Sequence, residues 1–148
     1  MSPKADLIKN RAVKNNFLLP SGEYDNIHPV FAFTYIEIDQ KNNVFSFRDN
    51  RIKSKEFGAL FENLKKMSQK TWREIKVENL WHAHEVKWAS TKRPKGFSNL
   101  PEKIQDFPAF QFKALKEKRI FGFFRSDNVF EIVWLDYDHA IYKNEKFN

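Results

Sequence analysis

Cysteine is absent from this chain of 148 residues, and glycine is scarce, with only 4 positions. The absence of cysteine excludes disulfides, thiolate zinc sites and a cysteine nucleophile, and it fits a reducing compartment. So few glycines argue against a glycine-rich phosphate loop or a dinucleotide fingerprint, and we expect no cofactor. No segment approaches the ~18 apolar residues of a membrane-spanning helix, and the first residues lack the apolar core of a signal peptide. We therefore expect a cytoplasmic protein that does not bind a membrane.

Basic residues are what the chain has in excess. Lysine and arginine total 26 against 19 acidic residues, which gives a net charge of +7. A basic domain of this length suggests a polyanionic partner, most often nucleic acid, although a soluble protein can also be basic without one. Hydrophobic residues make up 41% of the chain, enough for a single domain over residues 1–148 with a sizeable core. Residues 1–16 are polar and basic, and we expect them to form a mobile arm.

Five runs of β-branched and aromatic residues predict strands. Residues 30–38 and 44–47 flank a short polar loop and predict one strand pair, and residues 107–115 predict a third strand. Residues 119–125 and 129–135 flank a polar turn and predict a hairpin. Helical segments lie between the first pair and the later strands. This order predicts an α+β fold, a mostly antiparallel sheet with two helices packed on one face.

The helical segments are recognised by their start signals and their periodicity. Ser54 is expected to cap a first helix, because apolar residues recur after it at helical spacing. Thr71 and Glu74 match a capping box, so a second, short helix should start there, with Trp72 and Ile75 on its buried side. The apolar positions of the first helix are Phe57, Leu60, Phe61, Leu64 and Met67.

The polar turn of the hairpin leaves two registers open. A turn of two residues, Ser126 and Asp127, places Arg119 and Arg125 on the aromatic face of the hairpin. A turn of three residues places the arginines with Glu131 on a mixed face, which is the better half-buried sheet and which we prefer. The three residues then lie where a phosphate can bind, or they form cross-strand ion pairs. In this register the apolar face consists of Ile120, Gly122, Phe124, Phe130, Ile132 and Trp134.

The tail after the hairpin carries titratable side chains. His139 lies beside Asp136 and Asp138, and Tyr142 follows three residues later. A carboxylate near an imidazole can raise its pKa and suit it to proton transfer at neutral pH. The alternative is a solvated turn that follows the last strand.

A basic loop between residues 87 and 97 is the second candidate site. It mixes cations with aromatic rings, a pairing that suits single-stranded nucleic acid, and its alternative is an ordinary exposed loop. His82 and His84 precede it, but with His139 they have no recognised metal-binding spacing, and we predict no metal site. The candidate nucleic-acid-binding residues are Lys87, Trp88, Lys92, Arg93 and Lys95, together with Arg125 of the hairpin.

Four short segments occur in an order that matters for comparison with known families. They are Leu100-Pro101-Glu102, Phe110-Gln111-Phe112, the run 118–123 and the run 138–142. With them the chain, from about residue 99 to residue 142, resembles the RelE/ParE toxin superfamily of small basic proteins from toxin–antitoxin pairs. Several members of that superfamily cut messenger RNA on the ribosome.

This resemblance implies roles for individual residues. Arg119 would contact the scissile phosphate, His139 or Tyr142 would serve the proton transfers, and Glu102 or Glu131 would act as base. The implied activity is that of a metal-free endoribonuclease, a toxin whose partners are RNA or the ribosome and an antitoxin protein. A non-catalytic nucleic-acid-binding module and a protein-interaction domain from a mobile element are the alternatives. Steep salt dependence separates nucleic-acid binding from protein interaction.

Overall fold

The computed structural model describes residues 25–39 and 45–142, so the expected arm at 1–16 lies outside the described residues. A five-stranded sheet forms the centre of this part, in the order β1-β5-β4-β3-β2. Neighbouring strands are antiparallel except β1 and β5, which run parallel. The strands are β1 Phe31–Ala32, β2 His84–Glu85, β3 Ala109–Leu115, β4 Lys118–Phe124 and β5 Phe130–Asp136.

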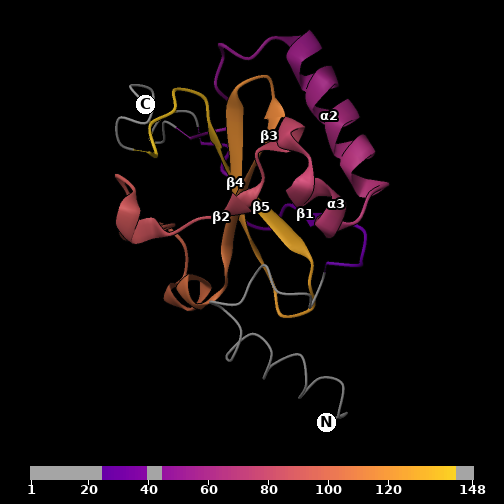
Figure 1. The fold of residues 1–148 in the computed structure, drawn as a ribbon. Helices are drawn as coiled ribbons and strands as arrows, with labels where there is room; N and C mark the ends of the chain where they lie inside the picture. Colours follow the sequence, from indigo (N-terminus) through magenta and orange to yellow (C-terminus); the bar gives the residue numbers. More distant parts are fainter. Residues whose placement is uncertain (1–24, 40–44, 143–148) are drawn as a thin grey trace.

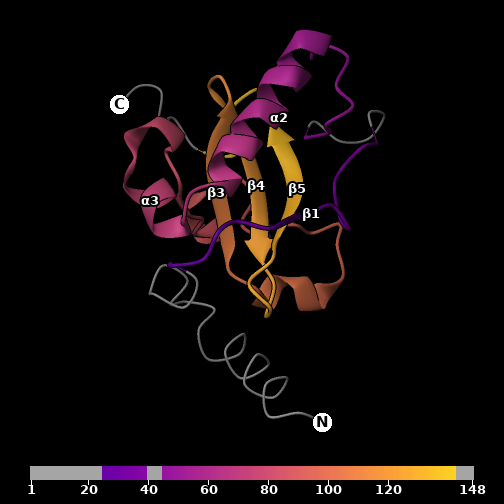
Figure 2. The same ribbon diagram turned by 90° about the vertical axis from the view of Figure 1, so that its right-hand side faces the viewer.

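Two helices, α2 (Ser54–Ser68) and α3 (Trp72–Val77), lie on one side of this sheet, which we call the helix face (Figure 1). Figure 2 shows α2 lying across β3, β4 and β5. The fully buried Trp72 packs edge-on against the rings of Phe110 and Phe124, with ring centroids 5.7 and 5.0 Å away. Burying an aromatic or aliphatic side chain of this size stabilises the fold by about 1.5–3 kcal/mol. The predicted α+β fold, a mostly antiparallel sheet with two helices on one face, is thus confirmed.

Residues 86–107 cover the opposite side of the sheet, which we call the loop face. Phe97 and Ile104 of this segment pack with Phe123 and Trp134 in a second buried cluster, and the rings of Phe97 and Trp134 lie 4.9 Å apart. All seven residues of β5 are buried as a result. The expectation of a half-buried, mixed hairpin face was therefore wrong, because a segment that reads as a loop supplies the cover.

The hairpin between β4 and β5 has the expected three-residue turn. The N–H of Arg125 donates to the carbonyl of Val129 at 2.9 Å, and Asn128 takes the left-handed conformation with φ of 69°. The preferred register holds near this turn, where Phe124 faces Phe130. It fails farther along, because Val133 is an extra residue between the pairs Phe121–Trp134 and Gly122–Ile132.

This β-bulge moves Trp134 to the loop face and Leu135 to the helix face, the reverse of a simple alternation. Gly122 lies opposite the bulge and is required there. A Cβ atom on Gly122 would lie 2.0 Å from the carbonyl oxygen of Glu131 and 2.7 Å from the ring of Phe130.

Helix α2 differs from its prediction in two details. Its N-cap is Lys53 rather than Ser54, because the Glu56 side chain accepts the backbone N–H of Lys53 at 2.8 Å. Phe61 fits the apolar spacing but is 59% exposed, since it lies beside the buried stripe of Leu60, Leu64 and Met67. The capping box of Thr71 and Glu74 is confirmed at the start of α3.

The strand pair expected at 30–38 and 44–47 is the largest error in the fold. Only residues 31–32 form a strand, and they pair with β5. Farther along, Glu37 N donates to the carbonyl of Val133 at 2.8 Å, while Leu135 N donates to the carbonyl of Phe45 at 2.9 Å. Both segments are therefore used to cover the edge of β5. None of the helices in the described ranges is long and apolar enough to cross a membrane.

Candidate functional site

Three polar residues form one row across the loop face, at the base of the β4–β5 hairpin. Arg119 of β4 lies opposite Lys113 of β3 on one side and opposite Asp136 of β5 on the other. Strand alternation puts this row on the same face as the buried ring of Phe121. Asp136 is only 1% exposed, and both cations are half-buried.

The tail after β5 folds back over this row. The Asp136 carboxylate accepts the backbone N–H groups of residues 140–141 at 2.7 and 3.0 Å, which closes the turn. The Tyr142 ring then lies 6.2 Å, centroid to centroid, from the rings of Phe121 and His84. Tyr142 is thus brought to the loop face, on the same side of the sheet as Arg119.

His139 lies in this turn, exposed and in the left-handed conformation with φ of 56°. The pKa of Glu117 is lowered mainly by its hydrogen bond from Lys113, and the charges of Arg119 and His139 lower it further. Both charges therefore act on the same carboxylate. We call Arg119, His139 and Tyr142 the Arg119 cluster, because the turn that holds His139 and leads to Tyr142 is closed on Asp136, the residue opposite Arg119.

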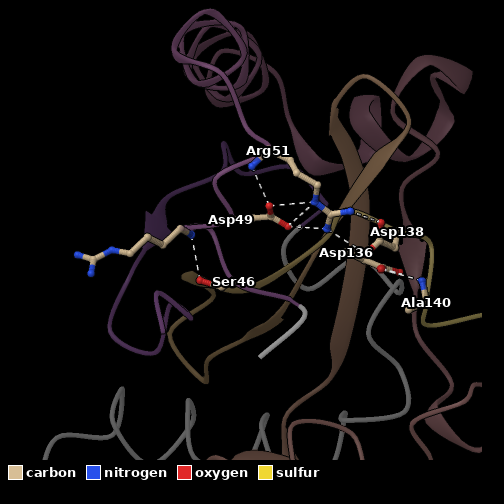
Figure 3. Close-up of polar contacts among 7 residues, drawn as sticks. Ser46, Asp49, Arg51, Asp136, Asp138 and Ala140 are labelled. Carbon is tan, nitrogen blue, oxygen red and sulfur yellow. Dashed lines mark hydrogen bonds and ion pairs between the residues drawn. The ribbon is translucent and has the colours of Figure 1, made fainter. Parts of the chain in front are cut away.

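The two aspartates that flank His139 have other partners. Arg51 donates to both oxygens of Asp138, at 2.8 and 3.0 Å, and also binds Asp49 (Figure 3). The guanidinium of Arg51 lies 4.3 Å above the ring of Tyr137. Burial raises the pKa of Asp136, and its hydrogen bonds from the backbone of the turn oppose that rise. Neither aspartate forms an ion pair with the Arg119 cluster in the described part of the chain.

Arg119 itself is a half-buried cation that has no hydrogen bond or ion pair within residues 25–39 and 45–142. Its Nε atom is buried without a partner. A guanidinium carries five N–H donors, and burying such a group is costly unless an anion or an acceptor meets it. The geometry therefore leaves Arg119 available to a ligand.

Sequence reasoning did not assign Gln111 and His84 to this site. Gln111 is fully buried, and its Nε2 atom donates to the carbonyl of His82 at 2.8 Å and lies 2.9 Å from His84 Nε2. His84 Nδ1 lies 2.8 Å from the carbonyl of Glu85, so Nδ1 carries the proton and Nε2 accepts from Gln111. Gln111 Oε1 is buried without a partner. A glutamine between two buried phenylalanines of a strand was the signal that could have revealed it.

Three other predicted site residues lie elsewhere. Arg125 is at the tip of the hairpin, roughly 20 Å along the strand from Arg119, and Glu131, which pairs with Phe123, is roughly 13 Å along it. The Glu131 carboxylate accepts from Arg125 at 3.1 Å and from the backbone and hydroxyl of Thr34 at 3.0 Å each. Glu102 is exposed in the 3₁₀ turn Glu102–Asp106. The structure does not place either glutamate beside Arg119: strand geometry separates Glu131 from it, and the 3₁₀ turn of Glu102 lies against the hairpin tip.

The basic loop lies next to the Arg119 cluster. Lys92 N donates to the carbonyl of Ile141 at 2.7 Å, and Thr91 forms a β-bridge with Tyr142. Lys87, Lys92, Arg93 and Lys95 are exposed as expected. Phe97 is 2% exposed and is therefore not available for stacking, whereas Trp88, which packs against it at 5.0 Å, is half-buried. Contact of Trp88 with nucleic acid stays a prediction.

A metal site is not indicated in the described part of the chain, where no group of three His, Asp or Glu side chains is placed to hold an ion. His82 lies near the cations of the site. Its pKa is lowered mainly by desolvation and then by the charges of Lys113 and Arg119.

Comparison with protein families gives one match, to the family described as Uncharacterised protein UU032, over residues 30–148. The chain belongs to this family. No curated protein and no solved structure matches it. The resemblance to the RelE/ParE superfamily was wrong, since a different family accounts for most of the chain, including the segments that carried the resemblance.

Proposed function

We propose that the protein binds RNA on its loop face, with Arg119 holding a phosphate and the basic loop 87–95 following the backbone. The observation that carries this proposal is the half-buried Arg119, which has no ion pair within the described residues, together with the exposed lysines of the neighbouring loop. The guanidinium is planar and binds phosphate through two N–H groups at once. The backbone contacts that join the loop to residues 141–142 make the two basic regions one surface.

The overall charge and composition support the same partner. The net charge of +7 favours association with a polyanion, and the absence of cysteine fits the cytoplasm, which we propose as the compartment. RNA, free or in the ribosome, is the proposed partner. The antitoxin was implied only by the resemblance to toxins, and we do not propose it.

Binding is tested with a fluorescein-labelled single-stranded RNA of about 12 nucleotides, by anisotropy at several salt concentrations. If about four phosphates are contacted, log Kd should rise with log salt with a slope near 3. Arg119→Gln should weaken binding roughly tenfold and lower the slope by about 0.7, because one phosphate contact is lost. Arg73→Gln is the matched control, since Arg73 lies on α3 at the helix face. A slope near zero, or an equal loss of RNA affinity in Arg119→Gln and Arg73→Gln, would contradict the proposal.

Metal-free cleavage of the bound RNA is the second candidate function, favoured by the presence of His139 and Tyr142 on the same side as Arg119. A base removes the 2′-hydroxyl proton, the oxygen attacks the adjacent phosphorus, and an acid protonates the leaving 5′ oxygen. With Glu102 and Glu131 at the other end of the sheet, His139 is the group suited to proton transfer and Arg119 to stabilising charge on phosphorus.

Cleavage is tested on end-labelled RNA in the presence of EDTA. The products should end in a 2′,3′-cyclic phosphate, and substrates made of deoxynucleotides should resist. Arg119→Gln should slow cleavage by about 10²-fold, and His139→Gln should remove one limb of the pH–rate profile. Wild-type protein that binds RNA but leaves it intact would exclude catalysis and keep the binding function.

A further inference from the structure

A hollow of about 290 Å³ opens on the loop face near the tip of the hairpin, away from the Arg119 cluster. Its lining includes three aromatic side chains, the buried Phe123 and the half-buried Tyr35 and Phe107. The centroid of Phe123 lies 5.9 Å from that of Tyr35 and 5.7 Å from that of Phe107, whose plane is within 22° of parallel. The hollow is thus a small recess with flat apolar walls.

The rim of the hollow is polar and lies on two different elements. Arg125, Ser126 and Asp127 come from the hairpin turn, and Lys103 comes from the 3₁₀ turn that covers this end of the sheet. The rim offers N–H donors, a hydroxyl and a carboxylate, together with a cation at the mouth. A ligand that matches it is flat and apolar on its faces, and it carries donors and acceptors on its edge.

Arg125 is fixed in position at this rim. Its Nε and one terminal nitrogen donate to Asp127, and its other terminal nitrogen donates to the buried Glu131 at 3.1 Å. Glu131 is held in turn by Thr34. Three of the five N–H groups of the guanidinium are used in this way, so two remain for a ligand. Asp127 keeps oxygen lone pairs on a side chain that is 43% exposed.

We propose that this hollow binds one nucleobase, guanine, of the RNA. Guanine fits because its O6 and N7 accept from a guanidinium, while its N1 and N2 donate to a carboxylate. Adenine presents a donor amino group where guanine has O6, so it matches Arg125 less well. The inference rests on the proposed function for the source of the base, and it adds base recognition to phosphate binding at the other end of the same face.

The hollow is tested directly with guanosine 5′-monophosphate added to the full ¹⁵N-labelled chain at millimolar concentration. Amide shifts should change at Lys103, Ser126 and Asp127, and AMP and ribose 5-phosphate should change them several-fold less. Tyr35→Ser should remove the response. Phe33→Ser is the matched control, because Phe33 is an exposed ring two residues away that does not line the hollow.

Binding of the base within RNA is tested with an oligomer that contains one guanosine and with the same oligomer carrying an abasic site there. Wild type should bind the abasic oligomer roughly tenfold more weakly than the oligomer with guanosine. Tyr35→Ser should bind the two oligomers equally. Arg119→Gln should weaken RNA binding and leave the response to GMP intact. RNA binding without a GMP response would overturn the proposal that the hollow binds guanine and would leave the proposed function standing. A GMP response without RNA binding would show that the guanine does not come from RNA. Equal responses to GMP and AMP would overturn the role of Arg125 in choosing guanine.

Discussion

Arg119 and Arg125 stand six residues apart on the same face of one hairpin, yet their surroundings differ. Arg125, at the tip, is bound by Asp127 and Glu131, and these two carboxylates raise the pKa of its guanidinium above its ordinary value. Arg119, at the base, faces Asp136, whose oxygens are taken by backbone N–H groups. Two arginines of one hairpin, each near a buried carboxylate of β5, thus differ: Arg125 forms an ion pair, and Arg119 forms none within the described residues.

The difference separates a cation that the protein neutralises with its own carboxylates from one for which we propose a ligand. At the tip the protein satisfies the buried charge of Glu131 with its own cation, so the fold there is complete without a partner. At the base a half-buried guanidinium has no ion pair within the described residues, and it is there that we propose an anion binds. Exposure alone would not have separated the two residues, since both are half-buried.

The largest expected effect on stability comes from a substitution at Gly122, which lies on β4 midway between Arg119 and Arg125. Gly122→Ala should destabilise the protein by about 3 kcal/mol or more, because the new Cβ meets a backbone oxygen that cannot rotate away. Urea unfolding measures the change. Gly58→Ala is the control: Gly58 lies in α2 with nothing within 4 Å, and alanine there should stabilise by about 1 kcal/mol. A tolerated Gly122→Ala would mean that the bulge is not fixed at this position.

The second prediction compares the two arginines directly. Arg125→Gln should cost about 2 kcal/mol, because it leaves the carboxylate of Glu131 buried without its cation. Arg119→Gln should change the free energy of unfolding by less than about 0.5 kcal/mol, because no ion pair within the described residues is lost. Both are measured by urea unfolding at pH 7 and low salt. Equal destabilisation by the two changes would remove the distinction between them.

The parts of the fold that the sequence predicted are those with strong local signals. Helical spacing and the capping box at Thr71 located α2 and α3, and alternation located β3, β4 and β5. The bulge at Val133 carries no local signal, because an inserted residue in a strand that is buried on both faces leaves the apolar pattern unbroken. The cover of the loop face by residues 86–107 was missed because that segment is rich in lysine and proline, and only a few scattered residues such as Val86, Phe97 and Ile104 are buried.

The candidate site, too, was predicted only where local signals along the chain locate its residues. Arg119, His139 and Tyr142 lie near one another along a hairpin and its tail, so their approach follows from short-range geometry. Glu102 and Glu131 were placed with them through a resemblance that the family match overturned. The contribution of Gln111 and His84 depends on the pairing of β2 with β3, which joins residues far apart in sequence.

The smallest expected effects concern the two aspartates beside the arginines, whose pKa values move in opposite directions. Arg125 lowers the pKa of Asp127, so its stabilisation is present above the unfolded pKa near 3.9 and is lost as the pH falls through the lower folded pKa. Burial raises the pKa of Asp136, so this group costs stability as the pH rises from about 4 through its raised folded pKa. Acidification from pH 7 to pH 4 therefore relieves a cost at Asp136, and acidification below pH 4 removes a stabilisation at Asp127.

Asn substitutions should separate these contributions through the slope of stability against pH. Asp136→Asn should lose stability more steeply than wild type between pH 7 and pH 4, because the compensating protonation is gone. Asp127→Asn should lose it less steeply than wild type below pH 4. Urea midpoints measured at half-unit pH intervals give both slopes, and only the slopes are compared, since each substitution also shifts stability at every pH. Parallel curves for Asp136→Asn and wild type would show that the Asp136 carboxylate titrates in the folded protein as it does in the unfolded chain.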